Sequence, residues 1–117
     1  MDVLFIFNDA PYGSERTYNG LRLAMTLQRS QAEIGVRIFL LGDAVACAVA
    51  GQTTPQGYYN LERMLRAVIA KGGQVKACGT CAGARGISAH GVLEGIEIGT
   101  MDQLTQWVVE SDNVLTF

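Results

Sequence analysis

The order of apolar positions along the chain predicts five strands. Val3 to Phe7 is continuously apolar, and Val36 to Leu41 repeats the pattern. Runs of β-branched and aromatic residues of this kind are typical of strands that are buried on both faces, as in a parallel sheet. We therefore expect both to be central strands. Three shorter segments carry a weaker form of the same signal: Gln74 to Cys78, Ile96 to Ile98 and Val114 to Phe117.

Two amphipathic helices are predicted between the first three strands. Ser14 is placed to cap the first helix, because its hydroxyl can accept a hydrogen bond from a free backbone N–H group. The second begins after Asn60 and ends at Gly72-Gly73, where glycine commonly terminates a helix. Both carry apolar residues at helical spacing, which indicates one face packed on a sheet. In the first helix these residues are Tyr18, Leu21, Ala24, Met25 and Leu27.

The second half of the chain carries a capping signal as well. Thr100 and Gln103 have the spacing of a capping box, in which each side chain satisfies a backbone donor of the first turn. We expect that helix to bury Leu104, Trp107 and Val108. Two shorter helices are also expected: Asp43 is placed to cap one, and the other begins within Ala82 to Ala89.

Strands and helices alternate along the whole chain. Crossover helices of this length predict a mainly parallel sheet with helices on both faces, an α/β fold, within one domain of 117 residues. Ligands of such sheets bind beyond the carboxyl ends of the strands. That rule singles out three loops: Asn8 to Ser14, Gly42 to Cys47, and Cys78 to Gly86.

Composition narrows the range of partners. The formal net charge is −2, and no cluster of the 9 basic residues is dense enough to follow a phosphate backbone, so we expect no nucleic-acid partner. No apolar run approaches the length of a membrane span, and the N-terminus lacks the basic start of a secretory signal. We expect a cytoplasmic protein without a membrane partner. A charged content of only 17% favours burial of surface in a homo-oligomer.

Candidate chemistry concentrates in Val75 to Gly86, VKACGTCAGARG. A cysteine thiolate becomes more available at a helix start or beside a cation. Cys78 has both within reach, because Gly79 and Thr80 form a tight turn and Arg85 follows closely. Cys78 is therefore a candidate nucleophile or sulfur carrier. The alternative is that it fills the core, as free cysteines often do.

The other thiols and the single histidine admit several roles. Cys78 and Cys81 have CxxC spacing, which also suits a dithiol redox pair. A zinc site would need two further ligands, and Cys47 and His90 lie at spacings that match no common zinc motif, so we expect no metal and no other cofactor. Cys47 is best interpreted as a core thiol, and His90 as a solvated loop residue.

Polar residues on the strand-end loops complete the candidate site. Asp9, Tyr12, Ser14 and Asp43 are expected at the same sheet edge as the cysteine loop, where they would share a pocket with Gly79 and Thr80. Local roles are equally compatible with two of them. Asp9 is then part of an Asx-turn and Ser14 only a helix cap.

Four segments together resemble the DsrE/DsrF-like family, most closely its small YchN-like members. They are NDAPYGSERTYNGLRLA, LLGDAV, VKACGTCAGARGIS and GIEIGTMDQLTQWVVESDNVLTF, and in this order they cover essentially the whole chain. The resemblance implies a three-layer α/β/α domain with a mostly parallel five-stranded sheet. It also implies symmetric homo-oligomers, often trimers paired into hexamers.

The resemblance also points to one residue. In sulfur-relay members of the family, a cysteine at the end of the third buried strand carries sulfur as a persulfide, and the residue that matches it here is Cys78. Cys81 belongs to the CxTC form of the YchN-like branch: either it resolves a Cys78 persulfide as a disulfide, or it has no role. The leading hypothesis is a sulfur carrier with donor and acceptor proteins as partners. Whether it also acts as an enzyme, a sulfurtransferase, stays open at this point. The alternatives are a non-catalytic oligomeric module and a Cys78/Cys81 redox protein.

Overall fold

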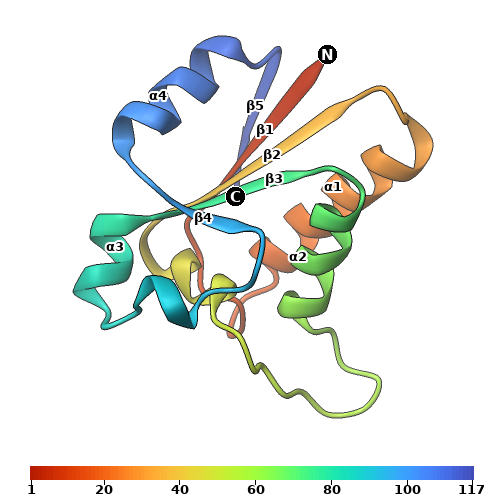
Figure 1. The fold of residues 1–117 in the computed structure, drawn as a ribbon. Helices are drawn as coiled ribbons and strands as arrows, with labels where there is room; N and C mark the ends of the chain where they lie inside the picture. The colour runs from red at the N-terminus through yellow and green to blue at the C-terminus, as the bar shows by residue number, and fades with distance from the viewer.

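The computed structural model describes residues 1–117 and contains one five-stranded sheet (Figure 1). Its strand order is β4-β3-β2-β1-β5, and every neighbouring pair is parallel. The two apolar runs form the central strands next to each other, which confirms their prediction. The strands are β1 (Asp2–Phe7), β2 (Gly35–Leu40), β3 (Gln74–Cys78), β4 (Ile96–Gly99) and β5 (Asn113–Thr116).

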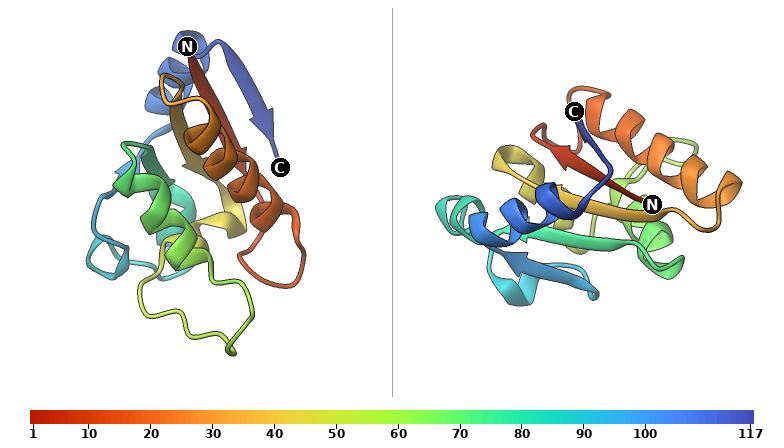
Figure 2. Two further views of the ribbon diagram at one scale, coloured as in Figure 1. Left: turned by 90° about the vertical axis from the view of Figure 1, so that its right-hand side faces the viewer. Right: turned by 90° about the horizontal axis from the view of Figure 1, so that it is seen from above.

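Helices cover both faces of this sheet, as expected. Helices α1 (Arg16–Ser30) and α2 (Leu61–Ala70) lie side by side on one face, and α4 (Met101–Glu110) lies on the other (Figures 1 and 2). The chain crosses from the β4 edge to the β5 edge through α4. None of these helices has the length and apolar character needed to span a membrane.

Aromatic side chains fill the space between the sheet and α1. The rings of Phe5, Phe7 and Phe117 pack together, with centroids 5.9 to 6.2 Å apart. Gly20 of α1 lies directly against them: a Cβ added there would be 2.8 Å from Cζ of Phe7 and 3.1 Å from Cδ1 of Phe117. Glycine is needed at this position because the helix backbone approaches the rings so closely.

Helix α4 covers the opposite face mainly with Trp107. The predicted capping box is present: the Thr100 side chain accepts from Gln103 N, and the Gln103 side chain accepts from Thr100 N. Trp107 packs edge-on against Phe39, with ring centroids 6.1 Å apart. Leu104 is buried as expected, but Val108 is 41% exposed. Neighbouring residues of a helix point in different directions, so Trp107 faces the sheet and Val108 does not.

Two predicted caps are wrong. Helix α1 begins only at Arg16, with Glu15 at the cap position; the Ser14 hydroxyl lies one residue before it, donates to the Asp9 carboxylate at 3.0 Å and accepts from Arg16 N at 3.5 Å. The short helix after β2 is a 3-10 helix, η1 (Gly42–Ala48), and Asp43 lies inside its first turn without capping it. Asn60, in contrast, caps α2 by accepting a hydrogen bond from Arg63 N.

The helix after β3 starts earlier than predicted. Helix α3 (Gly79–Ala84) follows the strand without a loop, and a 3-10 helix, η2 (Ala89–Gly91), comes after it. The cause is that Cys78 itself acts as the cap, since its sulfur accepts a hydrogen bond from Cys81 N at 3.4 Å. The sequence interpretation placed Gly79 and Thr80 in a turn, whereas both are helical. This shift brings both cysteines to the start of α3.

Candidate functional site

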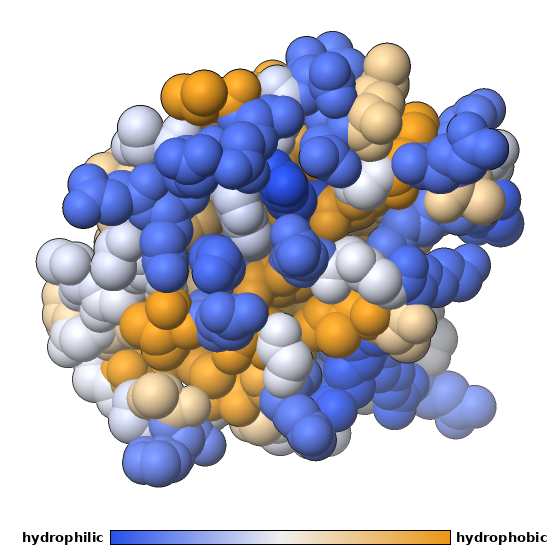
Figure 3. Space-filling model, turned by 45° about the horizontal axis from the view of Figure 1, so that its top comes forward, coloured by the Kyte–Doolittle hydropathy of each residue, from blue (hydrophilic) through white to orange (hydrophobic).

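The cysteine pair lies at the carboxyl edge of the sheet, where β3 passes into α3. Cys78 is the last residue of β3 and is 7% exposed, whereas Cys81 is partly exposed in the first turn of α3. Both line one cavity of about 560 Å³. Its largest apolar side chains are Leu41, which directly follows β2, Ile98 from β4 and Met101 from α4. Figure 3 shows apolar side chains reaching the surface between polar ones on one face of the molecule.

The two thiols contact each other directly. The backbone N–H group of Cys81 donates to Sγ of Cys78 at 3.4 Å, and the thiol of Cys78 forms a hydrogen bond with the sulfur of Cys81. Neither cysteine is in a disulfide. A sulfur pair one helical turn apart can therefore exchange a proton or close a bond without moving the backbone far.

The environment distinguishes the two thiols in acidity. Burial raises the pKa of Cys78, and the neighbouring Cys81 adds to that effect. For Cys81 the direction is opposite: the hydrogen bond from Cys78, a backbone hydrogen bond from Gly42 and the charge of Arg85 lower its pKa. The sequence favoured Cys78 as the more acidic thiol, and in this respect the expectation is reversed. Cys81 is therefore the more acidic thiol of the pair, and Cys78 is its hydrogen-bond donor.

Arg85 is held next to Cys81 and away from Cys78. Its Nη1 donates to the backbone carbonyl oxygen of Cys81 at 3.1 Å. Its Nε and Nη2 both donate to Oδ1 of Asp43, at 3.0 and 2.9 Å. The guanidinium therefore ties α3 to η1 and places a positive charge on the side of Cys81, whereas the sequence had assigned that charge to Cys78.

The structure divides the expected pocket in two. Gly79 and Thr80 line the cavity with the cysteines, and Asp43 reaches the site through Arg85. Tyr12 lies elsewhere: its hydroxyl donates to Gln52 at 2.7 Å and accepts from Leu61 N at 3.1 Å. Asp9 and Ser14 bond to each other before α1 and do not line the cavity. The strand-end rule identifies the correct edge of the sheet, but this edge is wide enough for two separate sites.

Comparison with known proteins places the whole chain in one family. The family model described as DsrE/DsrF-like family matches residues 1–117. The chain belongs to the DsrE/DsrF-like family. It is 43% identical to the Protein YchN of Escherichia coli over 115 residues, which covers 98% of this chain and 97% of YchN. An uncharacterized protein of Methanocaldococcus jannaschii is 41% identical over 117 residues, the full length of both chains.

Solved structures agree with this family assignment. The crystal structure of YchN from E. coli superposes with a TM-score of 0.94 at 42% identity, covering 99% of this chain and 98% of that one. A protein of unknown function from Methanobacterium thermoautotrophicum superposes with a TM-score of 0.79 at 13% identity, over 99% of this chain and 97% of that one. At that identity the likeness concerns the fold alone.

Within the DsrE/DsrF-like domain, sequence reasoning missed the far wall of the cavity. Ile98 and Met101 flank the end of β4, and Leu41 ends the apolar run of the second strand. The strand-end rule identifies β4 as a neighbour of the site once β4 is known to pair with β3. The sequence predicts β4 as a strand but carries no local signal for its position in the sheet.

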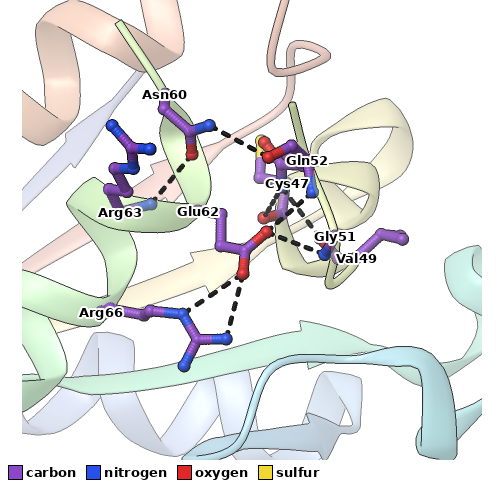
Figure 4. A network of polar contacts seen from close by, with 8 residues as sticks. All are labelled: Cys47, Val49, Gly51, Gln52, Asn60, Glu62, Arg63 and Arg66. Carbon is purple, nitrogen blue, oxygen red and sulfur yellow. Dashed lines mark hydrogen bonds and ion pairs between the residues drawn. The ribbon is translucent and has the colours of Figure 1, made fainter. Parts of the chain in front are cut away.

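The third thiol is structural. Cys47 is fully buried, and burial raises its pKa to about 12, so it remains a neutral core thiol, in agreement with the sequence interpretation. It lies in a polar network (Figure 4), in which the side-chain amide of Gln52 donates to the backbone carbonyls of Cys47 and Val49 at 2.9 and 3.0 Å. His90 is exposed in η2, and the carbonyl of the next residue, Gly91, accepts a hydrogen bond from Ala50 N at 3.1 Å beside this network.

Proposed function

We propose that this protein carries sulfane sulfur as a persulfide on Cys78. The observation that carries the proposal is the location of Cys78: it ends a central strand inside an apolar cavity, with a second thiol in hydrogen-bond contact. Membership of the DsrE/DsrF-like family supports it, because that family is linked to sulfur relay. The partners required are a protein or small molecule that donates sulfur and a thiol that accepts it.

The thiol pair provides a fast route for the proton transfer of loading, which solvent base replaces more slowly where Cys81 is substituted. A donor persulfide, R–S–SH, enters the cavity with its outer sulfur next to Cys78. Cys78 attacks that sulfur while its own proton passes to the Cys81 thiolate. The S–S bond of the donor breaks, R–S⁻ leaves, and Cys78–S–SH remains beside a neutral Cys81 thiol. Cys81 accepts the proton here, because its lowered pKa gives it a larger thiolate fraction than Cys78 has.

The apolar wall suits a sulfur cargo. Leu41 and Ile98 form an apolar wall of the cavity that Cys78 lines, and sulfur is a soft, polarisable atom that packs well against apolar side chains. Ile98 and Met101 are 38% and 59% exposed at the rim of the cavity. They offer an apolar contact surface to a donor or acceptor at the point where sulfur is exchanged.

One observation also favours a second candidate, a dithiol redox protein. Cys78 and Cys81 are in contact, and a pair with CxxC spacing at the start of a helix can cycle between dithiol and disulfide. Such a protein would form a reversible disulfide with an oxidant alone and would show no sulfur adduct. A non-catalytic module would retain its partners after Cys78→Ala and would leave both thiols unreactive.

Intact mass measurement after treatment with sodium polysulfide tests the proposal. The Cys81→Ser variant retains only one thiol of the pair and is expected to gain about 32 Da, the mass of one sulfur atom. The double variant Cys78→Ser/Cys81→Ser is the matched control and should gain none, although its buried Cys47 is intact. An equal adduct on the double variant, or no adduct on either protein, would exclude a persulfide on Cys78.

Assembly with identical chains is part of the proposal. Apolar side chains remain uncovered on the outside of α4 and on the β5 edge: Val109 is 77% exposed, Val108 41% and Val114 40%. An amphipathic helix with valines on its outer face is unfavourable in water and becomes stable when a symmetric copy covers it. The low charge content of the chain is in line with such an interface.

A further inference from the structure

Cys81 has the position of an attacking group as well as that of a base. Its sulfur is in hydrogen-bond contact with Sγ of Cys78, the atom that becomes the inner sulfur once a persulfide forms. The backbone of α3 holds this arrangement, since Cys81 N donates to the same Sγ at 3.4 Å. The outer sulfur is one S–S bond, about 2.05 Å, further from the Cys78 backbone. Contact with the inner sulfur exists before loading.

We propose that Cys81 discharges a persulfide on Cys78 by attacking its inner sulfur, which releases hydrosulfide and closes a Cys78–Cys81 disulfide. This inference rests on the proposed persulfide at Cys78. It assigns the protein a further activity, the reduction of sulfane sulfur to sulfide, and assigns Cys81 as the residue that commits the sulfur to release.

The step is balanced without any external oxidant. After loading, Cys81 first loses to solvent the proton that it took from Cys78. The Cys81 thiolate then attacks Sγ of Cys78–S–SH, the bond between Sγ and the outer sulfur breaks, and that sulfur leaves as HS⁻ with its own proton. The two cysteine sulfurs are oxidised to a disulfide, and the sulfane sulfur is reduced to sulfide. A dithiol reductant then returns the disulfide to two thiols, so each turnover consumes one dithiol and one sulfane sulfur atom.

The surroundings of the pair favour this direction of attack. Arg85 donates to the Cys81 carbonyl at 3.1 Å, and the Gly42 backbone bonds to the Cys81 sulfur, so the attacking sulfur is held beside its target. Cys78 is the more buried thiol, with a 7% exposed residue surface. A free acceptor thiol in solution must reach the outer sulfur from the cavity mouth, whereas Cys81 is already in place. Release to sulfide therefore precedes transfer unless an acceptor is docked.

A single-turnover experiment tests this inference. Reduced wild-type protein and the Cys81→Ser variant are loaded with sodium polysulfide and freed of excess reagent. Sulfide is then trapped with monobromobimane while intact mass is followed. Wild-type protein is expected to release sulfide and to end two hydrogen atoms lighter than its reduced form. Cys81→Ser should retain its sulfur adduct at least about tenfold longer, because the intramolecular thiol is gone. Cys47→Ala, which leaves the pair intact, should behave as the wild type.

The outcomes separate the inference from the proposal on which it rests. If Cys81→Ser holds sulfur on Cys78 but loses it at the wild-type rate, Cys81 has no part in discharge and the inference is wrong, while the persulfide stands. If neither protein takes up sulfur nor releases sulfide, the persulfide itself is excluded. Cys81→Ala serves as a second variant without the thiol. Far-ultraviolet circular dichroism of both variants shows whether they are folded. A wild-type protein that keeps a stable adduct also overturns the inference.

Discussion

Arg85 and Asp43, which are far apart in the sequence, form a two-pronged ion pair, with Nε and Nη2 of Arg85 at 3.0 and 2.9 Å from the same carboxylate oxygen. The pair joins α3 to η1 next to Cys81. Arg85 lowers the pKa of Cys81, and Asp43 balances part of that charge. The charge of Arg85 adds to the larger effects of the hydrogen bonds from Cys78 and Gly42, which lower the pKa of Cys81 most.

Removing Arg85 and removing Asp43 should shift the pKa of Cys81 in opposite directions. Arg85→Met removes the cation and should raise the pKa, whereas Asp43→Asn frees Arg85 from its counter-charge and should lower it further. The rate of carbamidomethylation at Cys81 as a function of pH, followed by peptide mass spectrometry, measures both shifts. Arg29→Met, an exposed change at the far end of α1, serves as the control. Shifts of the same sign in the two variants would contradict this account.

The three thiols should react with iodoacetamide in a fixed order at neutral pH. Cys81 comes first, because it is partly exposed and has a lowered pKa, so a larger fraction is thiolate. Cys78, with a raised pKa, should react on the order of tenfold more slowly. Cys47 should react only after unfolding. Competition between light and heavy reagent in one digest gives the order, and faster labelling of Cys78 than of Cys81 would show that the acidity is assigned to the wrong thiol.

The contact between Gly20 and the Phe7 ring predicts a clear effect on stability. Gly20→Ala inserts a methyl group where Phe7 and Phe117 leave no space, and should lower the free energy of unfolding by about 1–3 kcal/mol. Gly83→Ala is the matched control, since a Cβ there meets nothing within 4 Å and its backbone is helical. That change should be neutral or stabilise by up to about 1 kcal/mol. Urea unfolding of both variants measures the difference.

Glu62 should contribute to stability in a pH-dependent way. Its carboxylate accepts from the backbone N–H groups of Gly51 and Gln52, both at 2.8 Å, and from Arg66 (Figure 4). The Gln52 hydrogen bond is the largest cause of its lowered pKa, with Arg66 second. A pKa that is lower in the folded state contributes stability that is present above the unfolded value, about 4.3, and lost as the pH falls through the folded value.

Glu62→Gln removes this charge and tests the sign. The variant should be less stable than wild type near pH 7, by on the order of 1 kcal/mol, because charge-assisted hydrogen bonds are weakened. The difference should shrink as the pH falls below about 4. Glu33→Gln, at an exposed position, is the control and should leave the profile unchanged. A Glu62→Gln deficit that grows toward acid would mean that the carboxylate is not the stabilising form.

The strand predictions and the Thr100–Gln103 cap succeeded where the cause is local, whereas the caps expected from Ser14 and Asp43 are wrong. Val3 to Phe7 has the continuous apolar pattern of a buried strand because both of its faces are covered. The Thr100–Gln103 cap forms between residues of a single helical turn. Tyr12 was placed with Cys78 because the strand-end rule carries no information on which loops meet. The acidity of the cysteines was reversed for a similar reason. It depends on Gly42 and on an Arg85 that bonds to Asp43, and no local spacing indicates these contacts.

The exposed valines of α4 predict a self-association that one substitution should weaken. Wild-type protein is expected to sediment as an oligomer, well above its chain mass of 12.6 kDa. Val109→Asp places a charge on the uncovered face, where Val109 is 77% exposed, and should shift the distribution toward the monomer without unfolding the chain. Thr26→Asp, an exposed change on α1, is the control. A wild-type protein that sediments only as a 12.6 kDa species would rule out this interface.

The most direct measurement for the central claim is the location of sulfur after loading. Cys81→Ser protein treated with sodium polysulfide, blocked with N-ethylmaleimide and digested is expected to carry one extra sulfur, about 32 Da, on the peptide that contains Cys78. The peptide that contains Cys47 should carry none. Sulfur found equally on both peptides, or on neither while Cys78 is fully alkylated, would contradict a persulfide at Cys78.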